Sequence, residues 1–255
     1  MASSERFGYE WQKYSFLAPA YEEQFRAWIA PLTPLDFKNK TVLDAGCGMG
    51  RNSFWALEYG AREALAFDLD ERSVESARKN LQEFYTAGVE QHSIYDINWR
   101  ERFDIVMCIG VLHHLENPKS ALINLFKALR PGGKLVLWVY SFEGNERLLT
   151  WLDPLRRYLT SKLPVSLVHA IAYLFSVPLW LYVHLFRSKD EYLGRLRGFD
   201  FWHVHSIVFD QLIPRVANYW RQSEVSNLVE SAGIANFLIH NPPHGTGWTL
   251  IARKL

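Results

Sequence analysis

A glycine-rich turn at residues 41–52 constrains the fold of this chain more than any other stretch. The apolar run Thr41-Val42-Leu43-Asp44-Ala45 leads into three glycines spaced two apart, Gly46, Gly48 and Gly50, and a helical pattern follows. Glycine lets the backbone turn tightly and approach a ligand without a side chain in the way. The N-terminus of the next helix presents unpaired N–H groups to a polar or anionic group. We therefore expect a strand, a turn and a helix that together hold a ligand.

The composition favours a globular chain with a sizeable apolar core. The chain has 255 residues, of which 49% are hydrophobic and 22% are charged, so it is not typical of disordered proteins. Its net charge of +1 does not indicate a basic surface, and we expect no nucleic-acid partner. Cys47 and Cys108 lie in apolar contexts, which predicts two reduced, buried thiols. The N-terminal residues lack the apolar stretch of a secretory signal, so we expect a cytoplasmic protein.

Short apolar runs alternate with helical patterns between residues 41 and 139. The predicted strands cover 42–43, 64–67, 89–93, 103–109 and 134–139, and the predicted helices cover 52–59, 71–84 and 119–129. This order favours a parallel sheet with helices on both faces. Ligands bind at the carboxyl ends of the strands in such sheets. Asp68, Asp96 and Ile109-Gly110 all lie at the ends of predicted strands, as the glycine turn does.

The remaining residues predict helical additions to this core. Residues 1–39 form the expected N-terminal helical cap, whose aromatic side chains either pack on the core or close over the glycine turn. Residues 40–140 and 219–255 form the core, which ends in a helix at 224–232 and a hairpin at 237–239 and 248–252. Residues 141–218 form a helical insertion, which we expect to bind the substrate or to act as a lid.

The segment Leu163–Phe186 is the most apolar part of the insertion. It contains no Asp, Glu, Lys or Arg, and it is long enough to span a bilayer. However, Pro178 should break or kink a helix, and His169 and His184 interrupt the apolar run. We therefore expect an apolar helical hairpin rather than a transmembrane helix. This hairpin would either cover the active site or make a peripheral contact with a membrane through residues 163–186.

Five motifs follow one another along the core. They are Val42-Leu43-Asp44-Ala45-Gly46-Cys47-Gly48-Met49-Gly50, Phe67-Asp68-Leu69-Asp70, Asp96-Ile97, Phe103-Asp104-Ile105-Val106 with Val111-Leu112-His113-His114-Leu115, and Leu129-Arg130-Pro131-Gly132-Gly133. Together they resemble class I S-adenosylmethionine (SAM)-dependent methyltransferases of the small-molecule group. The resemblance covers residues 40–140 closely and 219–255 loosely. It implies an α/β, Rossmann-like, seven-stranded and mostly parallel sheet with helices on both faces, and with the N-terminal cap and the helical insertion as additions.

The resemblance also implies a SAM site, whose product is S-adenosyl-L-homocysteine. Asp68 would accept hydrogen bonds from both ribose hydroxyls, and Leu69, Asp96 and Ile97 would contact the adenine. Arg51 stands where a nicotinamide-binding turn has its third glycine, so the turn does not indicate NAD. Arg51 and Tyr14 are candidates for the methionine carboxylate. The implied cofactor-binding residues are Tyr14, Asp44, Gly46, Cys47, Gly48, Gly50, Arg51, Asp68, Leu69, Asp96, Ile97, Ile109 and Gly110.

His113 and His114 are the candidate catalytic residues. One of them would act as a general base or orient the substrate near the methyl group; alternatively, both pack locally at a helix start. Adjacent residues on a helix point about 100 degrees apart, so they make a poor chelating pair and we expect no metal. The candidate substrate residues are Tyr21, His203, His205 and Tyr219. His203 and His205 would share a face if they lay on a strand.

Methyl transfer from a sulfonium is an in-line displacement, which alignment and the exclusion of water accelerate. A base is needed only where the acceptor is protonated at the working pH. Residues 7–37 and 140–215 are apolar and aromatic, so we expect a small, largely apolar acceptor such as a lipid, an isoprenoid or a polyketide-like molecule. The alternatives are a non-catalytic SAM-binding or regulatory protein, and a methyltransferase for a polar glycan or another natural-product precursor. The sequence does not indicate the oligomeric state.

Overall fold

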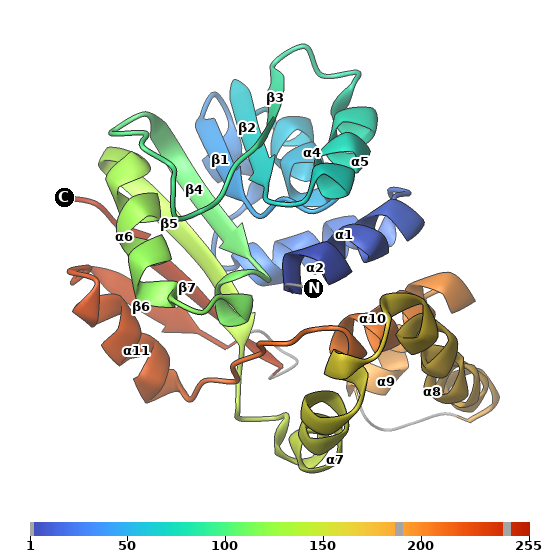
Figure 1. Ribbon diagram of the computed structural model, residues 1–255. Helices are drawn as coiled ribbons and strands as arrows, with labels where there is room; N and C mark the ends of the chain where they lie inside the picture. The colour runs from blue at the N-terminus through green and yellow to red at the C-terminus, as the bar shows by residue number, and fades with distance from the viewer. Residues whose placement is uncertain (1–2, 187–190, 242–245) are drawn as a thin grey trace.

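The computed structural model describes residues 3–186, 191–241 and 246–255 (Figure 1). It is organised around a seven-stranded sheet in the order β3–β2–β1–β4–β5–β7–β6. The strands β1 to β5 pair in parallel, whereas β7 runs antiparallel to both β5 and β6. This topology confirms the predicted fold class and the final hairpin. The strands are β1 (Thr41–Ala45), β2 (Glu63–Asp68), β3 (Ala87–Gln91), β4 (Phe103–Ile109), β5 (Leu129–Tyr140), β6 (Phe237–His240) and β7 (Gly247–Arg253).

Alternate residues of the strands build one apolar core on each face of the sheet. Val42 on β1 faces one core and Leu43 faces the other, because successive side chains of a strand point to opposite faces. Cys47 and Cys108 are buried free thiols, as predicted. The face of Val42 is covered by α2 (Ala20–Ile29), α3 (Pro34–Phe37), α4 (Arg51–Glu58) and α5 (Glu71–Leu81), and the face of Leu43 by α6 (Pro118–Ala128) and α11 (Gln222–Ser231).

The N-terminal helix α1 (Ser3–Lys13) joins the sheet domain to the helical insertion. Its residue Arg6 is 1% exposed. The Arg6 guanidinium donates hydrogen bonds to the carbonyl oxygens of Thr160 at 2.8 Å and of Ser161 and Leu163 at 3.1 Å. On its other side, α1 packs along α5. The cap is thus fastened both to the core and to the insertion.

The insertion contains α7 (Glu146–Tyr158), α8 (Val165–Leu185), α9 (Glu191–Leu196) and α10 (Phe201–Leu212), of which α8 packs against α10. The predicted hairpin at 163–186 is wrong, because α8 continues through Pro178. Proline removes the hydrogen bond to the carbonyl four residues earlier. That carbonyl belongs to Leu174, whose side chain is 72% exposed, so it lies on the side that water can reach. The helix α8 is long and apolar enough to cross a membrane, and 22% of its apolar window is buried; the cytoplasmic location stays a prediction.

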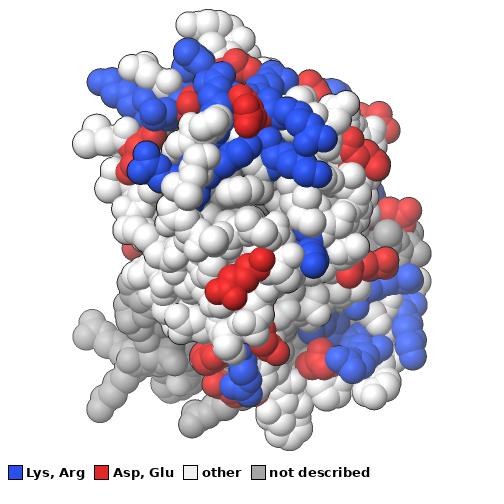
Figure 2. Space-filling model, turned by 90° about the vertical axis from the view of Figure 1, so that its left-hand side faces the viewer, with Lys and Arg blue, Asp and Glu red and all other residues white. Residues whose placement is uncertain are grey.

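Charged side chains of both signs share the surface at the end of the sheet where the parallel strands begin. The Arg102 guanidinium lies 3.2 Å from the Glu63 carboxylate, and the Lys134 ammonium lies 2.7 Å from the Asp36 carboxylate. Figure 2 shows lysine and arginine gathered with acidic side chains at the upper end of one face, above a largely uncharged middle. Exposed pairs of this kind contribute little stability. They also interrupt the positive field that a dense basic surface would produce.

Candidate functional site

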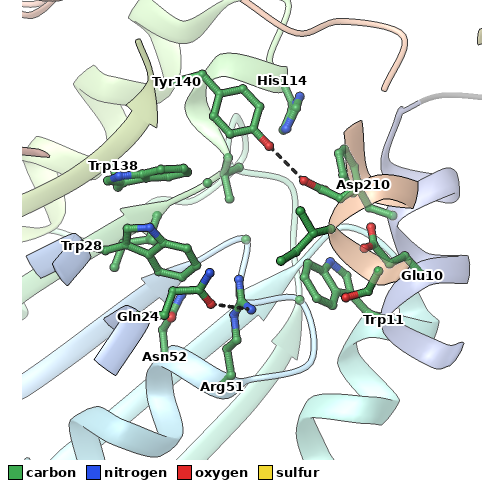
Figure 3. A pocket seen from close by; sticks show the side chains of 18 of the residues that line it. Glu10, Trp11, Gln24, Trp28, Arg51, Asn52, His114, Trp138, Tyr140 and Asp210 are labelled. Carbon is green, nitrogen blue, oxygen red and sulfur yellow. Dashed lines mark hydrogen bonds between the residues drawn. The ribbon is translucent and has the colours of Figure 1, made fainter. Parts of the chain in front are cut away.

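A cavity of about 1010 Å³ opens at the carboxyl ends of the parallel strands. Its sheet side is formed by the glycine turn, the ends of β2 and β4 and the loop after β3. Its lid side is formed by α1, α2, α9 and α10. Figure 3 shows side chains from both sides pointing into one space. A ligand in this space would touch both the core and the helical additions.

The glycine turn approaches its neighbours so closely that side chains would not fit. Gly46, Gly48 and Gly50 have φ angles of 72°, 55° and 83°, a region that favours glycine. A Cβ atom on Gly46 would lie 2.5 Å from the side chain of Val111, and one on Gly48 would lie 2.9 Å from the Trp11 indole. Gly46 and Gly48 also line the cavity. A ligand can therefore lie directly against the backbone of the turn.

Asp68 ends β2 and lines the cavity beside the turn. One carboxylate oxygen accepts a hydrogen bond from the Gly48 amide at 3.0 Å, and the other accepts one from the Asp70 amide at 3.1 Å. Burial raises the pKa of this carboxyl, while the amide donors hold it in position. The carboxylate has further lone pairs for two ligand hydroxyls. Its place and chemistry fit the ribose of SAM.

Asp44 lies beneath the turn rather than in the cavity wall. It is 1% exposed, and its Oδ2 accepts a hydrogen bond from the Ser53 hydroxyl at 2.7 Å. Its Oδ1 and the Oδ1 of Asn52, a cavity residue, are buried and have no hydrogen-bond partner among the residues described. Unpaired buried oxygens are rare in folded proteins. A ligand with donor groups, such as the ammonium of an amino acid, would satisfy the Asn52 oxygen, which borders the cavity.

Asp44 should make the stability of the ligand-free protein depend on pH. Burial raises its pKa from 3.8 to about 6, so the folded state holds the proton more tightly than the unfolded state. Stability is therefore lost as the pH rises through this window, and the loss is about 3 kcal/mol. In Asp44→Asn this loss should be absent, and urea unfolding of both proteins across the window measures the difference. Parallel pH profiles of wild type and variant would contradict the prediction.

The loop after β3 reaches the cavity earlier in the sequence than predicted. Leu69 and residues 92–95 line the cavity. Asp96 is exposed, Ile97 is buried in the core, and neither belongs to the cavity wall. The reason is that β3 already ends at Gln91, so the turn that follows it is the part that passes the site. The contact of Asp96 and Ile97 with adenine stays a prediction, and residues 92–95 are better placed for it.

Arg51 directs its guanidinium into an aromatic part of the cavity (Figure 3). The group lies 4.8 Å from the ring centroid of Trp28, 5.1 Å from that of Tyr21 and 5.4 Å from that of Trp11. It also donates a hydrogen bond to Gln24 at 3.3 Å. None of these partners is a carboxylate. A guanidinium without a carboxylate partner can bind the carboxylate of a ligand. This is the role predicted for Arg51 at the methionine end of SAM.

The other predicted cofactor residues border the same cavity. Tyr14, Cys47, Ile109 and Gly110 all line it. The Tyr14 hydroxyl is hydrogen-bonded to His169 Nε2 at 2.9 Å, which leaves Arg51 as the better candidate for the carboxylate. Burial raises the pKa of the Cys47 thiol, so this thiol stays protonated and contributes packing.

His113 and His114 have different environments. His113 is fully buried outside the cavity wall, and its ring packs on Tyr140 with centroids 3.9 Å apart. His114 lines the cavity, and its Nδ1 donates a hydrogen bond to the Val216 carbonyl at 2.8 Å. Burial lowers the pKa of His114 to about 4, so its Nε2 carries no proton at neutral pH. His114 can therefore accept a hydrogen bond from a ligand, but it is a weak base.

Three of the four predicted substrate residues line the cavity, namely Tyr21, His203 and Tyr219. His203 and His205 do not share a face, because they lie in α10, where residues two apart point in nearly opposite directions. His205 instead shares a hydrogen bond with Ser176 at 2.7 Å, away from the cavity wall. The pairing of the two histidines on one face is therefore wrong.

Several cavity residues were not singled out from the sequence, among them Glu10, Trp138, Tyr140 and Asp210. Two of them carried a usable signal. Tyr140 ends β5 at the same edge of the sheet as the glycine turn, where ligands bind. Asp210 is an acidic residue in an otherwise largely apolar helix, and such a residue is usually paired or functional. Glu10 carried no signal, because the charged groups that face it, Arg51 and Asp210, are distant in sequence.

Comparison with known proteins identifies the core. A family described as "Methyltransferase domain" matches residues 43–137. The tRNA U34 carboxymethyltransferase of Vibrio campbellii is 32% identical over 192 residues, covering 72% of this chain and 57% of the relative. The enzyme of that name from Nautilia profundicola is 32% identical over 130 residues, covering 49% of this chain and 42% of the relative. The chain spans about half the length of these curated relatives.

Human N-acetylserotonin methyltransferase in complex with SAM shares the fold of this chain, with a TM-score of 0.58 and 14% identity. The match covers 99% of this chain and 56% of the human enzyme.

These relatives overturn one prediction. Both curated relatives are named for U34 of a tRNA, so the exclusion of nucleic acid in favour of an apolar small molecule is wrong. The features that fit SAM are in the chain itself: the glycine turn, Asp68 at the end of β2, and the unpaired oxygens of Asp44 and Asn52. Residues 43–137 of the chain therefore match a methyltransferase domain, and the features of the site fit SAM as the cofactor of that domain.

Proposed function

We propose that this chain transfers a methyl group from SAM to an acceptor held between the sheet edge and the helical insertion. The observation that carries this proposal is that the glycine turn with Asp68 and the lid side chains open into one cavity. The core at 40–140 and 219–255 would hold SAM, and the cap at 1–39 and the insertion at 141–218 would hold the acceptor. The lid would exclude water and align the acceptor, as an in-line transfer requires.

The acceptor side of the cavity is aromatic but not purely apolar. The ring centroids of Trp28 and Trp138 lie 5.1 Å apart, and those of Trp138 and Tyr140 lie 5.5 Å apart. Glu10 and Asp210 add carboxylates to the same wall. Aromatic walls with a few polar groups favour a planar acceptor that also forms hydrogen bonds. This chemistry replaces the apolar acceptor expected from the composition.

A nucleobase of tRNA is the acceptor that we propose. It is planar and polar, and the curated relatives are named for a tRNA uridine. Enzymes that modify a base take it out of the stack and hold it in a pocket with aromatic walls. The cavity of about 1010 Å³ is at the upper end of the range for binding pockets, which leaves space for a base beside the cofactor.

Isotope-labelled SAM and total tRNA test this proposal. The protein is incubated with both, the tRNA is digested to nucleosides, and mass spectrometry locates the label. Label in one nucleoside is the expected result, with the mass increment of one methyl group. A protein that binds SAM but leaves all nucleosides unlabelled would contradict the tRNA acceptor. A protein that does not bind SAM would contradict the proposed function as a whole.

A further inference from the structure

The SAM site described above leaves two carboxylates of the cavity wall without an assigned role. Glu10 comes from α1 and Asp210 from α10, and both line the lid side of the cavity (Figure 3). Glu10 is 1% exposed, and its Oε2 is buried without a hydrogen-bond partner among the residues described. A buried carboxylate without a full set of partners is costly. The arrangement therefore indicates a group that interacts with a bound ligand.

A chain of hydrogen bonds holds Asp210 in position. The Tyr140 hydroxyl donates to Asp210 Oδ2 at 2.9 Å, and the Gln211 amide donates to the Tyr140 hydroxyl at 3.0 Å. Gln211 in turn accepts a hydrogen bond from the Tyr219 hydroxyl at 2.8 Å. These hydrogen bonds connect the lid helix α10 to the end of the core strand β5. Asp210 is thus fixed through Oδ2, while its Oδ1 has no hydrogen-bond partner among the described residues and stays available to the methyl acceptor.

Nearby positive charges do not neutralise the two carboxylates. Arg51 faces both of them from α4, and Arg156 faces Asp210 from α7. However, the Arg51 guanidinium lies against aromatic rings, and Arg156 is paired with Asp153 at 2.8 Å. Neither arginine forms a direct ion pair with Glu10 or Asp210 within the described part of the chain. The two carboxyl groups therefore have no direct ionic partner on the lid side of the cavity.

Both carboxyl groups hold protons more tightly than usual. Burial raises the pKa of each, and the charge of Asp210 raises that of Glu10 further. A base poised closer to neutral pH is more effective in proton transfer than an ordinary carboxylate. The other titratable groups that face the pair are tyrosines from the surrounding elements, namely Tyr14, Tyr21, Tyr140 and Tyr219.

We infer that Asp210, with Glu10 beside it, accepts the proton of the nucleophile that receives the methyl group. The inference rests on the proposed methyl transfer and specifies its acceptor as an O–H or N–H group. As the acceptor oxygen or nitrogen bonds to the methyl carbon, the carbon–sulfur bond breaks and its electron pair stays on sulfur. The proton of the acceptor passes to the Asp210 carboxylate. The products are the methylated acceptor, the neutral thioether S-adenosylhomocysteine and a protonated Asp210, which returns its proton to water.

Two SAM analogues test this placement without knowledge of the acceptor. S-adenosylhomocysteine lacks the methyl group and its positive charge, whereas sinefungin carries a protonated amine at that place. If the carboxylates face the methyl position, wild type should bind sinefungin about ten-fold more tightly at neutral pH, because a charge-assisted hydrogen bond forms. Asp210→Asn should bring the two affinities within about two-fold of each other. Isothermal titration calorimetry measures both affinities.

The pH dependence and the control variants separate this role from a structural one. The preference for sinefungin should fall as the pH falls, because Asp210 becomes protonated and loses its charge. Glu23→Gln neutralises an exposed carboxylate at the cavity rim and should keep the preference. Glu10→Gln and Tyr140→Phe should each reduce it, and they carry the test if Asp210→Asn unfolds.

Three outcomes decide between the proposals. Equal affinities for the two analogues in wild type would overturn the role of the carboxylate pair. An unchanged preference in a folded Asp210→Asn variant would overturn it too. Failure of wild type to bind either analogue would instead overturn the proposed function, because the cofactor site itself would then be absent.

Discussion

Asp68→Ala should lower the affinity of this protein for SAM by about 100-fold or more. The Asp68 carboxylate lines the cavity at the end of β2, where it can accept hydrogen bonds from both ribose hydroxyls. Each hydrogen bond to a charged group contributes about 1.5–3 kcal/mol, and the substitution removes two. It also leaves the Gly48 amide without its acceptor at 3.0 Å, which loosens the turn that contacts the ligand. Isothermal titration with SAM measures the loss.

A neighbouring carboxylate provides the control for Asp68. Glu71 lies in the first turn of α5 and is exposed, so Glu71→Ala should bind SAM as wild type does. Asp68→Asn should lose less affinity than Asp68→Ala, because one oxygen remains as an acceptor. Wild-type affinity in Asp68→Ala, or an equal loss in Glu71→Ala, would show that the ribose is held elsewhere.

The sheet and the cofactor side of the site could be predicted because their determinants are local. The φ angles of Gly46, Gly48 and Gly50 favour glycine, and these three glycines lie close together in the sequence. Alternation on β1 places Val42 and Leu43 in opposite cores, which a period of two already indicates. Asp68 follows a short apolar run, and the end of such a strand is where this fold binds ligands.

The contacts that hold the lid side could not be predicted, because they join residues far apart in the chain, although Tyr21, His203 and Tyr219 do line the cavity as predicted substrate residues. Arg6 is bonded to a carbonyl 154 residues away, and Tyr140 is bonded to Asp210 across 70 residues. Neither contact leaves a periodic or local signal in the sequence. The histidines show the same limit: His114 lines the cavity and His113 does not, although they are adjacent. Which of two neighbours faces a ligand depends on the turn that carries them and on the elements packed against it.

Gly46→Ala should destabilise the protein and impair SAM binding at the same time. Gly46 has a φ angle of 72°, which costs an alanine about 1–2 kcal/mol. The new Cβ would also lie 2.5 Å from one methyl group of Val111 and 2.9 Å from the other, and relieving such a contact costs about 1–3 kcal/mol more. Either the turn or Val111 must move, and both border the cavity. We expect the affinity for SAM to fall by about ten-fold or more, since about 1.4 kcal/mol is lost for each factor of ten.

Gly233→Ala separates backbone strain from the clash. Gly233 has a φ angle of 82°, and a Cβ there would have no atom within 4 Å. It follows α11 on the far side of the sheet from α4 and α5. Gly233→Ala should therefore lose only about 1–2 kcal/mol of unfolding free energy and bind SAM normally. In Gly46→Ala combined with Val111→Ala, removal of the valine methyl groups should restore part of the SAM affinity. Equal stability and equal SAM affinity in the two alanine variants, measured by urea unfolding and calorimetry, would mean that the close approach of the turn to Val111 is not needed for binding.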